Sequence, residues 1–322
     1  MNNKEIYKKT IGFSVRRLIW DVVAVLLFVV MSAIGYVVME STTNKGLIGL
    51  AIGVVVGAVA VFILLRYIAF SYKAGQIAMM TKGIVEKKLS GDVIAQGKQE
   101  VKGRFPTVAA YFAATGVIKG VFDQVGVGIT AVGNAVGGDA GGAIGGTISS
   151  AVKTVVEYLC DCCLGWVFYR KNEKAGRATC EGAVIFFKHG KALVKNLGRI
   201  FGMSILSFVV IGGAFTGIFY LIMANMNGVF SKLSAEVIEA AARANKELPA
   251  AVSDPNVLAL IAAAICGIVL WGILHATFVK PFILVGVLRN FITAGMKDTP
   301  SEEEFKELDK KSKKFKELHD EI

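Results

Sequence analysis

A long apolar stretch near the N-terminus, residues 19–39, constrains the fold of this chain most, because it carries no charged side chain after Asp21 until Glu40. A helix needs about 20 predominantly apolar residues to cross the hydrocarbon core of a bilayer. A second stretch of this kind follows at residues 47–65, after a short polar segment. The pair predicts a tight transmembrane hairpin. The first stretch is too long for a cleaved signal peptide, so we expect it to be a permanent anchor.

Two more apolar stretches, at residues 200–223 and 257–279, satisfy the same length criterion. The chain as a whole is 54% hydrophobic and has a mean hydropathy of +0.58, which is too apolar for a soluble domain with a polar surface. These features indicate an all-α, polytopic integral membrane protein.

The distribution of lysine and arginine predicts the topology. Positive charge is concentrated before residue 19, at residues 73–104 and at residues 170–199, whereas residues 225–256 are balanced or slightly acidic. The positive-inside rule places the three basic segments in the cytoplasm. An even number of crossings must separate the last two, so we predict six transmembrane helices, with both termini in the cytoplasm of a plasma (inner) membrane. The alternative is a re-entrant segment that enters and leaves on the same side.

The chain therefore divides into six predicted parts. The first three are residues 1–72, an N-terminal amphipathic segment and the first transmembrane hairpin; residues 73–104, a basic cytoplasmic segment; and residues 105–169, a Gly-rich membrane hairpin made of spans at about 106–132 and 143–169. The last three are residues 170–199, a basic cytoplasmic loop; residues 200–296, the last two spans with an external amphipathic helix at 230–248 and an interfacial helix at 282–296; and residues 297–322, a charged cytoplasmic C-terminal helix. Ser301 and Glu304 predict a capping box at the start of the last helix. We expect that helix to be a solvated tail or a short oligomerisation helix.

Four ionisable residues lie in the third and fourth predicted spans: Lys119, Asp123, Lys153 and Glu157. Within each span the two charges are four residues apart and share one helix face. In a hairpin folded about Gly138, Lys119 faces Glu157 and Asp123 faces Lys153, so both pairs have opposite sign. This quartet predicts either a polar pathway for an ion or polar solute, or a structural cluster that fixes the hairpin register.

A glycine zipper joins these two predicted spans, with small residues at every fourth position: Gly133, Gly137, Gly141 and Gly145. Glycines at this spacing allow two helices to approach closely in lipid. The zipper predicts close packing, either within the hairpin or in a homo-oligomer or pore. A flexible loop is the alternative, because each glycine lowers helix stability by roughly 1 kcal/mol.

The cysteine and histidine residues give little sign of a metal site. Cys160, Cys162, Cys163 and Cys180 lack the separated pairs that structural zinc sites use, so we expect buried, reduced thiols and no metal. His275, close to Trp271, is expected to hydrogen-bond a neighbouring helix.

Common catalytic motifs are missing, including the G-x-x-x-x-G-K-[ST] loop, H-E-x-x-H and G-x-S-x-G. We therefore expect neither an enzyme nor a cofactor. Residues 73–104 lack interleaved aromatic side chains, so they predict attraction to anionic lipids of the bilayer and no nucleic-acid binding.

One stretch resembles a known family. Residues 157–166 (EYLCDCCLGW), followed by Arg170–Asn172, Cys180, Phe186 and the KNLGR segment at 195–199, are similar to the cysteine-rich cytoplasmic segment of choline-transporter-like proteins. The resemblance implies transport of a cationic, amine-type solute.

Together these features predict an oligomeric membrane channel or carrier for an ion or small polar solute. Two alternatives remain open. One is a non-transporting membrane scaffold or stress-response protein, and the other is a triggered permeabilising protein that forms pores.

Overall fold

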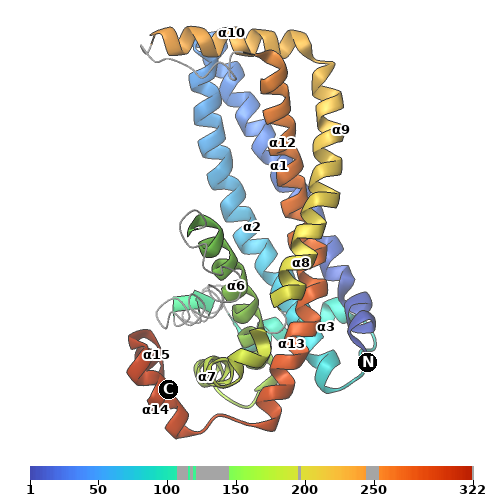
Figure 1. Cartoon of the computed structure of the whole chain (residues 1–322), viewed down its shortest axis with the longest axis vertical. Coiled ribbons are helices and arrows are strands. Elements are labelled where there is room, and N and C mark those ends of the chain that lie inside the picture. Colours follow the sequence, from blue (N-terminus) through green and yellow to red (C-terminus); the bar gives the residue numbers. More distant parts are fainter. Residues whose placement is uncertain (107–114, 117–118, 121–144, 195–196, 244–253, 321–322) are drawn as a thin grey trace. The chain divides into compact units, whose positions relative to one another are not determined.

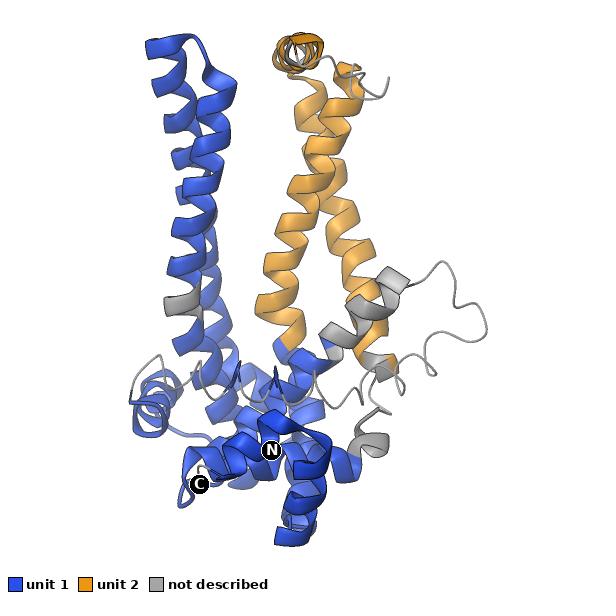
Figure 2. Ribbon diagram, turned by 90° about the vertical axis from the view of Figure 1, so that its left-hand side faces the viewer, with its two compact units in different colours: residues 1–197, 281–322 blue, residues 198–280 orange. Residues whose placement is uncertain are grey.

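The computed structural model describes residues 1–106, 115–116, 119–120, 145–194, 197–243 and 254–320, and all regular secondary structure in these ranges is helical (Figure 1). In chain order the elements are α1 (Asn3–Thr43), α2 (Gly46–Val85), α3 (Val93–Arg104), α6 (Gly145–Tyr169), α7 (Ala175–Val194), α8 (Leu197–Ser207), the π-helix η1 (Phe208–Gly212), α9 (Gly213–Ala224), α10 (Asn227–Arg243), α12 (Pro255–Leu274), the π-helix η2 (His275–Val279), α13 (Lys280–Lys297), α14 (Glu302–Lys311) and α15 (Lys313–Asp320). They form two compact units, residues 1–197 with 281–322, and residues 198–280 (Figure 2).

Four helices in the described ranges are long and apolar enough to cross a membrane: Asn3–Thr43, Gly46–Val85, Ile200–Ala224 and Pro255–Lys297. Each contains one of the four clearest predicted spans, which confirms those predictions as apolar helices of spanning length. Helix α6, which contains most of the predicted fourth span, is not in this group because Lys153, Glu157 and Asp161 interrupt its apolar character. Most of the predicted third span lies outside the described residues.

The first hairpin is closed by the predicted tight turn. Asn44 adopts a left-handed conformation (φ 52°) and ends α1, with its backbone N–H donating to the carbonyl oxygen of Glu40 at 3.1 Å. The Glu40 carboxylate in turn accepts a 2.8 Å hydrogen bond from the backbone N–H of Gly46, the first residue of α2. Asparagine tolerates positive φ well, which explains the reversal at this position.

Glycines bring α1 and α2 into direct backbone contact. Gly49, Gly53 and Gly57 lie every fourth residue along α2, facing α1. A Cβ atom added to Gly53 would lie 2.5 Å from the carbonyl oxygen of Met31, and one added to Gly35 would collide with the carbonyl oxygen of Gly49. Small residues at four-residue spacing therefore do pack a hairpin in this protein. They do so in the first hairpin, whereas Gly133, Gly137 and Gly141 lie outside the described residues.

The large side chains of this hairpin point outward. Leu26, Val37 and Val55 are 60%, 61% and 63% exposed, and many other valine and isoleucine residues of α1 and α2 are similarly uncovered. So much contiguous apolar surface is incompatible with water as the surrounding solvent. Lipid is the medium that suits it.

The second unit, residues 198–280, contains another antiparallel hairpin, in which α9 packs against α12. Ala259, Ala263 and Gly267 form a buried small-residue stripe on α12, and a Cβ atom added to Gly267 would lie 2.8 Å from the backbone nitrogen of Thr216. Between α9 and α12 comes α10, which confirms the predicted amphipathic helix for its described part. Its Phe230 is buried, whereas its Lys232 is exposed.

The first unit contains a helical domain with a dense core. The second half of α2 is buried from residue 74 to residue 81, and it packs against α3 and α6. Helix α13 was predicted to lie along the membrane interface, but the structure buries its Ile283, Leu288 and Phe291 completely inside this unit. Packing against protein therefore accounts for the apolar character of α13, and a lipid-facing surface is not needed to explain it.

The C-terminal helices also belong to this domain. Phe305 and Leu308 of α14 and Phe315 of α15 are buried against Cys180 and Ala183 of α7. The predicted capping box at Ser301 and Glu304 is confirmed. This segment was expected to be a solvated tail or an oligomerisation helix. Both expectations were wrong about its apolar side chains, which face neither solvent nor a second chain but pack against α7 of the same chain.

Candidate functional site: polar contacts and a basic cavity in the helical domain

The two ends of the segment 105–169 meet in the first unit. The rings of Phe105 and Phe168 stack edge to face with their centroids 5.8 Å apart. Arg104 donates to the backbone carbonyl oxygens of Arg170 at 3.0 Å and Glu173 at 2.6 Å, in the turn that follows α6. The two segments that flank residues 105–169 therefore lie next to each other in the first unit.

A second contact ties the N-terminus to the segment after the last span. The guanidinium group of Arg289 on α13 donates to the side-chain oxygen of Asn3 at 2.6 Å and to the backbone carbonyl oxygen of Met1 at 2.8 Å. The N-terminal segment and α13 consequently lie next to each other in the first unit.

The structure places only part of the predicted quartet. Lys119 and Glu157 both have exposed side chains, Lys153 belongs to α6, and Asp123 lies outside the described residues. The pairing of these four charges therefore stays a prediction. Of the zipper glycines, Gly145 is the first residue of α6.

A fifth charge on the same face of α6 is engaged in an ion pair that sequence reasoning missed. Asp161 continues the four-residue spacing of Lys153 and Glu157, and its carboxylate lies 2.6 Å from the ammonium group of Lys73 on α2. The Asp161 side chain is only 4% exposed, whereas that of Lys73 is 34% exposed. The regular spacing was the signal that could have extended the quartet to this residue.

A second buried carboxylate, that of Glu181, connects α6 to α7. It accepts hydrogen bonds from the indole N–H of Trp166 at 2.9 Å and from the Arg170 guanidinium at 2.8 and 2.9 Å. The hydrogen bonds to Glu181 raise the pKa of Arg170 above its usual value. A carboxylate with this many charge-assisted partners is a structural fixture of the domain core.

The histidine of the last span has the predicted role. His275 Nε2 lies 3.0 Å from the Ser204 hydroxyl on α8, and the indole N–H of Trp271 donates to the Ser207 hydroxyl at 3.1 Å. Both contacts join α8 to the segment formed by α12 and η2. Pro281 is the second residue after η2, and this π-helical turn accommodates a residue that cannot donate a backbone hydrogen bond.

The cysteines are free thiols. Cys162, Cys163 and Cys180 are buried, and within the described ranges no cluster of histidine, cysteine, aspartate or glutamate side chains could hold a metal ion. Burial raises the pKa of the Cys180 thiol to about 12.

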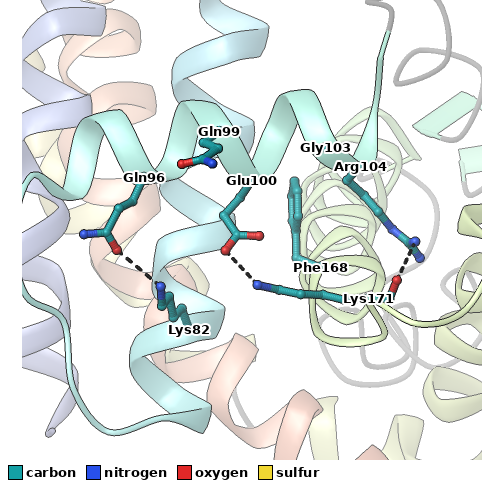
Figure 3. A pocket seen from close by; sticks show the side chains of 8 residues that line it. All are labelled: Lys82, Gln96, Gln99, Glu100, Gly103, Arg104, Phe168 and Lys171. Carbon is teal, nitrogen blue, oxygen red and sulfur yellow. Dashed lines mark hydrogen bonds and ion pairs between the residues drawn. The ribbon is translucent and has the colours of Figure 1, made fainter.

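The largest cavity among those characterised in the domain, of about 390 Å³, is basic (Figure 3). Helix α3 contributes one face to it, at positions spaced three and four residues apart, and α2 and the end of α6 supply the opposite wall. Its lining consists of Lys82, Gln96, Gln99, Glu100, Gly103, Arg104, Phe168 and Lys171. A neighbouring cavity of about 200 Å³ shares Lys82, Glu100, Phe168 and Lys171 with it.

The cationic groups around this cavity are held by few negative partners. The Lys82 ammonium donates to the neutral side-chain oxygen of Gln96 at 3.2 Å. Among the described residues, Lys171 is the one cation lining the cavity that forms an ion pair, with Glu100 at 2.7 Å. Arg104 is bound to backbone carbonyl groups, and burial lowers its pKa. The basic segment 73–104, predicted from its composition, thus directs Lys82 and Arg104 into one cavity.

No family model, no curated protein and no solved structure matches this chain. The resemblance of residues 157–199 to choline-transporter-like proteins remains a prediction that rests on the matched residues alone. In the structure the described residues of this range form the C-terminal half of α6, the whole of α7 and the start of α8.

Proposed function

We propose that this chain is a membrane scaffold protein, in which packed helix hairpins hold a helical domain at one face of the bilayer. The observation that carries this proposal is the continuity of α1 and α2. Each helix extends without a break from an exposed apolar part into the helical domain of the first unit, where residues such as Ile6 and Phe13 of α1 and Met79 and Met80 of α2 are buried.

The length of these helices supports rigid anchoring. Helix α2 has 40 residues, which correspond to about 60 Å, roughly twice the thickness of the hydrocarbon core. Half of the helix suffices to cross the bilayer, and the other half is built into the domain. A domain connected in this way keeps a fixed orientation to the membrane, which suits the presentation of a surface to partners.

The packing inside each hairpin argues against a solute route there. Backbone contacts at Gly53 and Gly267 close the space between the paired helices. The charged pairs, Lys73 with Asp161 and Arg170 with Glu181, belong to the helical domain. A channel or carrier is the second candidate, and the features that favour it are the predicted quartet and the resemblance of residues 157–199.

We further propose four crossings and a re-entrant middle segment in place of six crossings. Lys73 lies eight residues, about 12 Å, past Leu65, the end of the apolar stretch of α2. The part of α6 before its contact with Lys73 has 16 residues, or about 24 Å, and thus falls short of the roughly 30 Å hydrocarbon core. The basic segments support placing the domain and both termini in the cytoplasm, at the plasma (inner) membrane.

An uptake experiment separates the two candidate functions. The purified chain is reconstituted into sealed liposomes, and entry of radiolabelled choline, the amine solute implied by the resemblance, is compared with entry into protein-free liposomes. Potassium entry is followed in parallel with a fluorescent indicator. The scaffold proposal expects both rates to match the protein-free rates. Uptake above that level, abolished by Lys119→Gln with Glu157→Gln in a chain that still folds, would overturn it in favour of transport.

A further inference from the structure

We propose that the basic cavity beneath α3 binds a small, soluble anion that carries a phosphate group. The cavity brings together residues from three parts of the chain: α2, α3 and the segment that follows α6 (Figure 3). This inference does not depend on the scaffold proposal, because the uptake assay tests the membrane hairpins and a binding assay tests the domain.

The charge of the cavity selects the ligand class. Three cationic side chains, those of Lys82, Arg104 and Lys171, line it together with one carboxylate, that of Glu100. The lining therefore carries a formal excess of two positive charges. A phosphate monoester carries a charge of about −1.5 to −2 at neutral pH and offers three acceptor oxygens, so it matches the excess charge better than a carboxylate does.

Two of the cationic groups are free to move to a ligand. Lys82 is held by a neutral amide oxygen at 3.2 Å, a weaker partner than a doubly charged phosphate. The Lys171 side chain is 53% exposed, and its pair with Glu100 is of the solvent-screened kind that contributes little stability. Arg104 is different, because its hydrogen bonds to backbone carbonyl groups hold it to the turn that follows α6.

The position of the cavity favours a soluble ligand over a lipid headgroup. Lys82 lies 17 residues beyond Leu65, which is about 26 Å along the axis of α2 at 1.5 Å per residue. The phosphate of a lipid headgroup would have to move most of that distance away from the membrane interface to reach the cavity. A dissolved metabolite reaches the cavity without such displacement.

Calorimetric titration of the full chain in phosphatidylcholine nanodiscs with inorganic phosphate tests the inference. Wild-type protein should bind phosphate saturably, and acetate much more weakly. Lys82→Met should weaken phosphate binding by about tenfold, as expected for the loss of one charge-assisted hydrogen bond. Glu100→Gln should tighten binding several-fold, because it removes the carboxylate that repels the ligand. Lys102→Met is the matched control, since Lys102 lies on the same helix, is exposed and does not line the cavity.

A second variant and a second membrane composition keep the test decisive. Lys171→Met replaces Lys82→Met if the latter protein does not fold, and it should also weaken binding. A lack of saturable binding, or equal losses in Lys82→Met and Lys102→Met, would overturn the inference. A repeat in nanodiscs containing phosphatidic acid distinguishes the source. If the affinity for inorganic phosphate is unchanged in these nanodiscs, the ligand is a soluble one. If phosphatidic acid competes with inorganic phosphate, and the competition requires Lys82, the cavity binds the phosphate of a lipid headgroup instead.

Discussion

Lys73 of α2 and Asp161 of α6 form an ion pair, with 2.6 Å between the ammonium nitrogen and a carboxylate oxygen. The pair fixes the cysteine-rich end of α6 beside the part of α2 that follows its apolar stretch. Because the Asp161 side chain is only 4% exposed, loss of this ion pair is expected to be costly.

Removal of Lys73 should therefore destabilise the protein strongly. We expect Lys73→Met to lower the free energy of unfolding by about 3 kcal/mol, because it leaves a buried carboxylate without its cation. Combining it with Asp161→Leu should recover most of the loss. Thermal unfolding in detergent provides the measurement. Lys171→Met, which breaks the more exposed pair with Glu100, is the control and should change stability by less than about 1 kcal/mol.

The small-residue contact of the second hairpin gives another prediction. Gly267→Val should destabilise the pairing of α9 and α12 by roughly 1–3 kcal/mol or more, since the added atoms meet the backbone of Thr216. Gly272→Val on the same helix is a matched control, because no atom of the described structure lies within 4 Å of a Cβ atom added there. Equal unfolding temperatures for the two variants would contradict the packing described for this hairpin.

The attachment of the C-terminal helices is testable by proteolysis. Phe315→Ala removes a fully buried ring from the contact with α7 and should cost about 3 kcal/mol, enough to release α14 and α15 part of the time. Limited trypsin digestion of the variant should then remove the C-terminal segment faster than in wild-type protein. Lys313→Ala, at an 85% exposed site, should digest like wild type. A wild-type tail that is cleaved as fast as that of Phe315→Ala would indicate that this segment is solvated after all.

The buried thiols predict a strongly pH-dependent reactivity. With a pKa of about 12, only about one in 10⁴ Cys180 side chains is a thiolate at pH 8, so maleimide labelling of the folded protein should be slow and should rise about tenfold per pH unit. Cys160, which is partly exposed, should label first. The raised pKa also means that this burial contributes stability below the unfolded-state pKa near 9, and that this contribution is lost as the pH rises toward 12. Mass spectrometry after timed labelling gives the rates, and rapid labelling of Cys180 at pH 8 would show that its burial is transient.

Local signals in the sequence predicted local structure well. The turn after Glu40 and the capping box at Ser301 depend on a few adjacent residues, and both are confirmed. A hydrogen bond from His275 to a neighbouring helix was expected, because a polar ring in an apolar helix needs a partner. The sequence did not identify Ser204 as that partner.

Tertiary features were harder to predict, for physical reasons. A buried helix in a protein core and a helix at a membrane interface can have similar apolar content, so α13 was assigned to the interface. Phe305 and Phe315 become buried through α7, which is distant in sequence. The four-residue glycine spacing in α2 is the same pattern that predicted a glycine zipper at residues 133–145. It was recognised there and not in α2, because the glycines at 133–145 are denser. The basic cavity requires three separate segments to meet, and no local pattern indicates that Lys82 and Lys171 lie close together.

The sidedness of the first hairpin and the domain tests the central claim most directly. One exposed thiol is introduced by Ser41→Cys, at the exposed tip of α1, or by Lys313→Cys, at an exposed position of α15, in a chain in which Cys160 and Cys266 are replaced by alanine and the buried cysteines are kept. Intact cells that express each variant are treated with a membrane-impermeant maleimide, before and after permeabilisation. We predict that position 41 reacts from outside and that position 313 reacts only after permeabilisation. Reaction of both positions from the same side would contradict a hairpin that crosses the membrane and holds the domain on the opposite face.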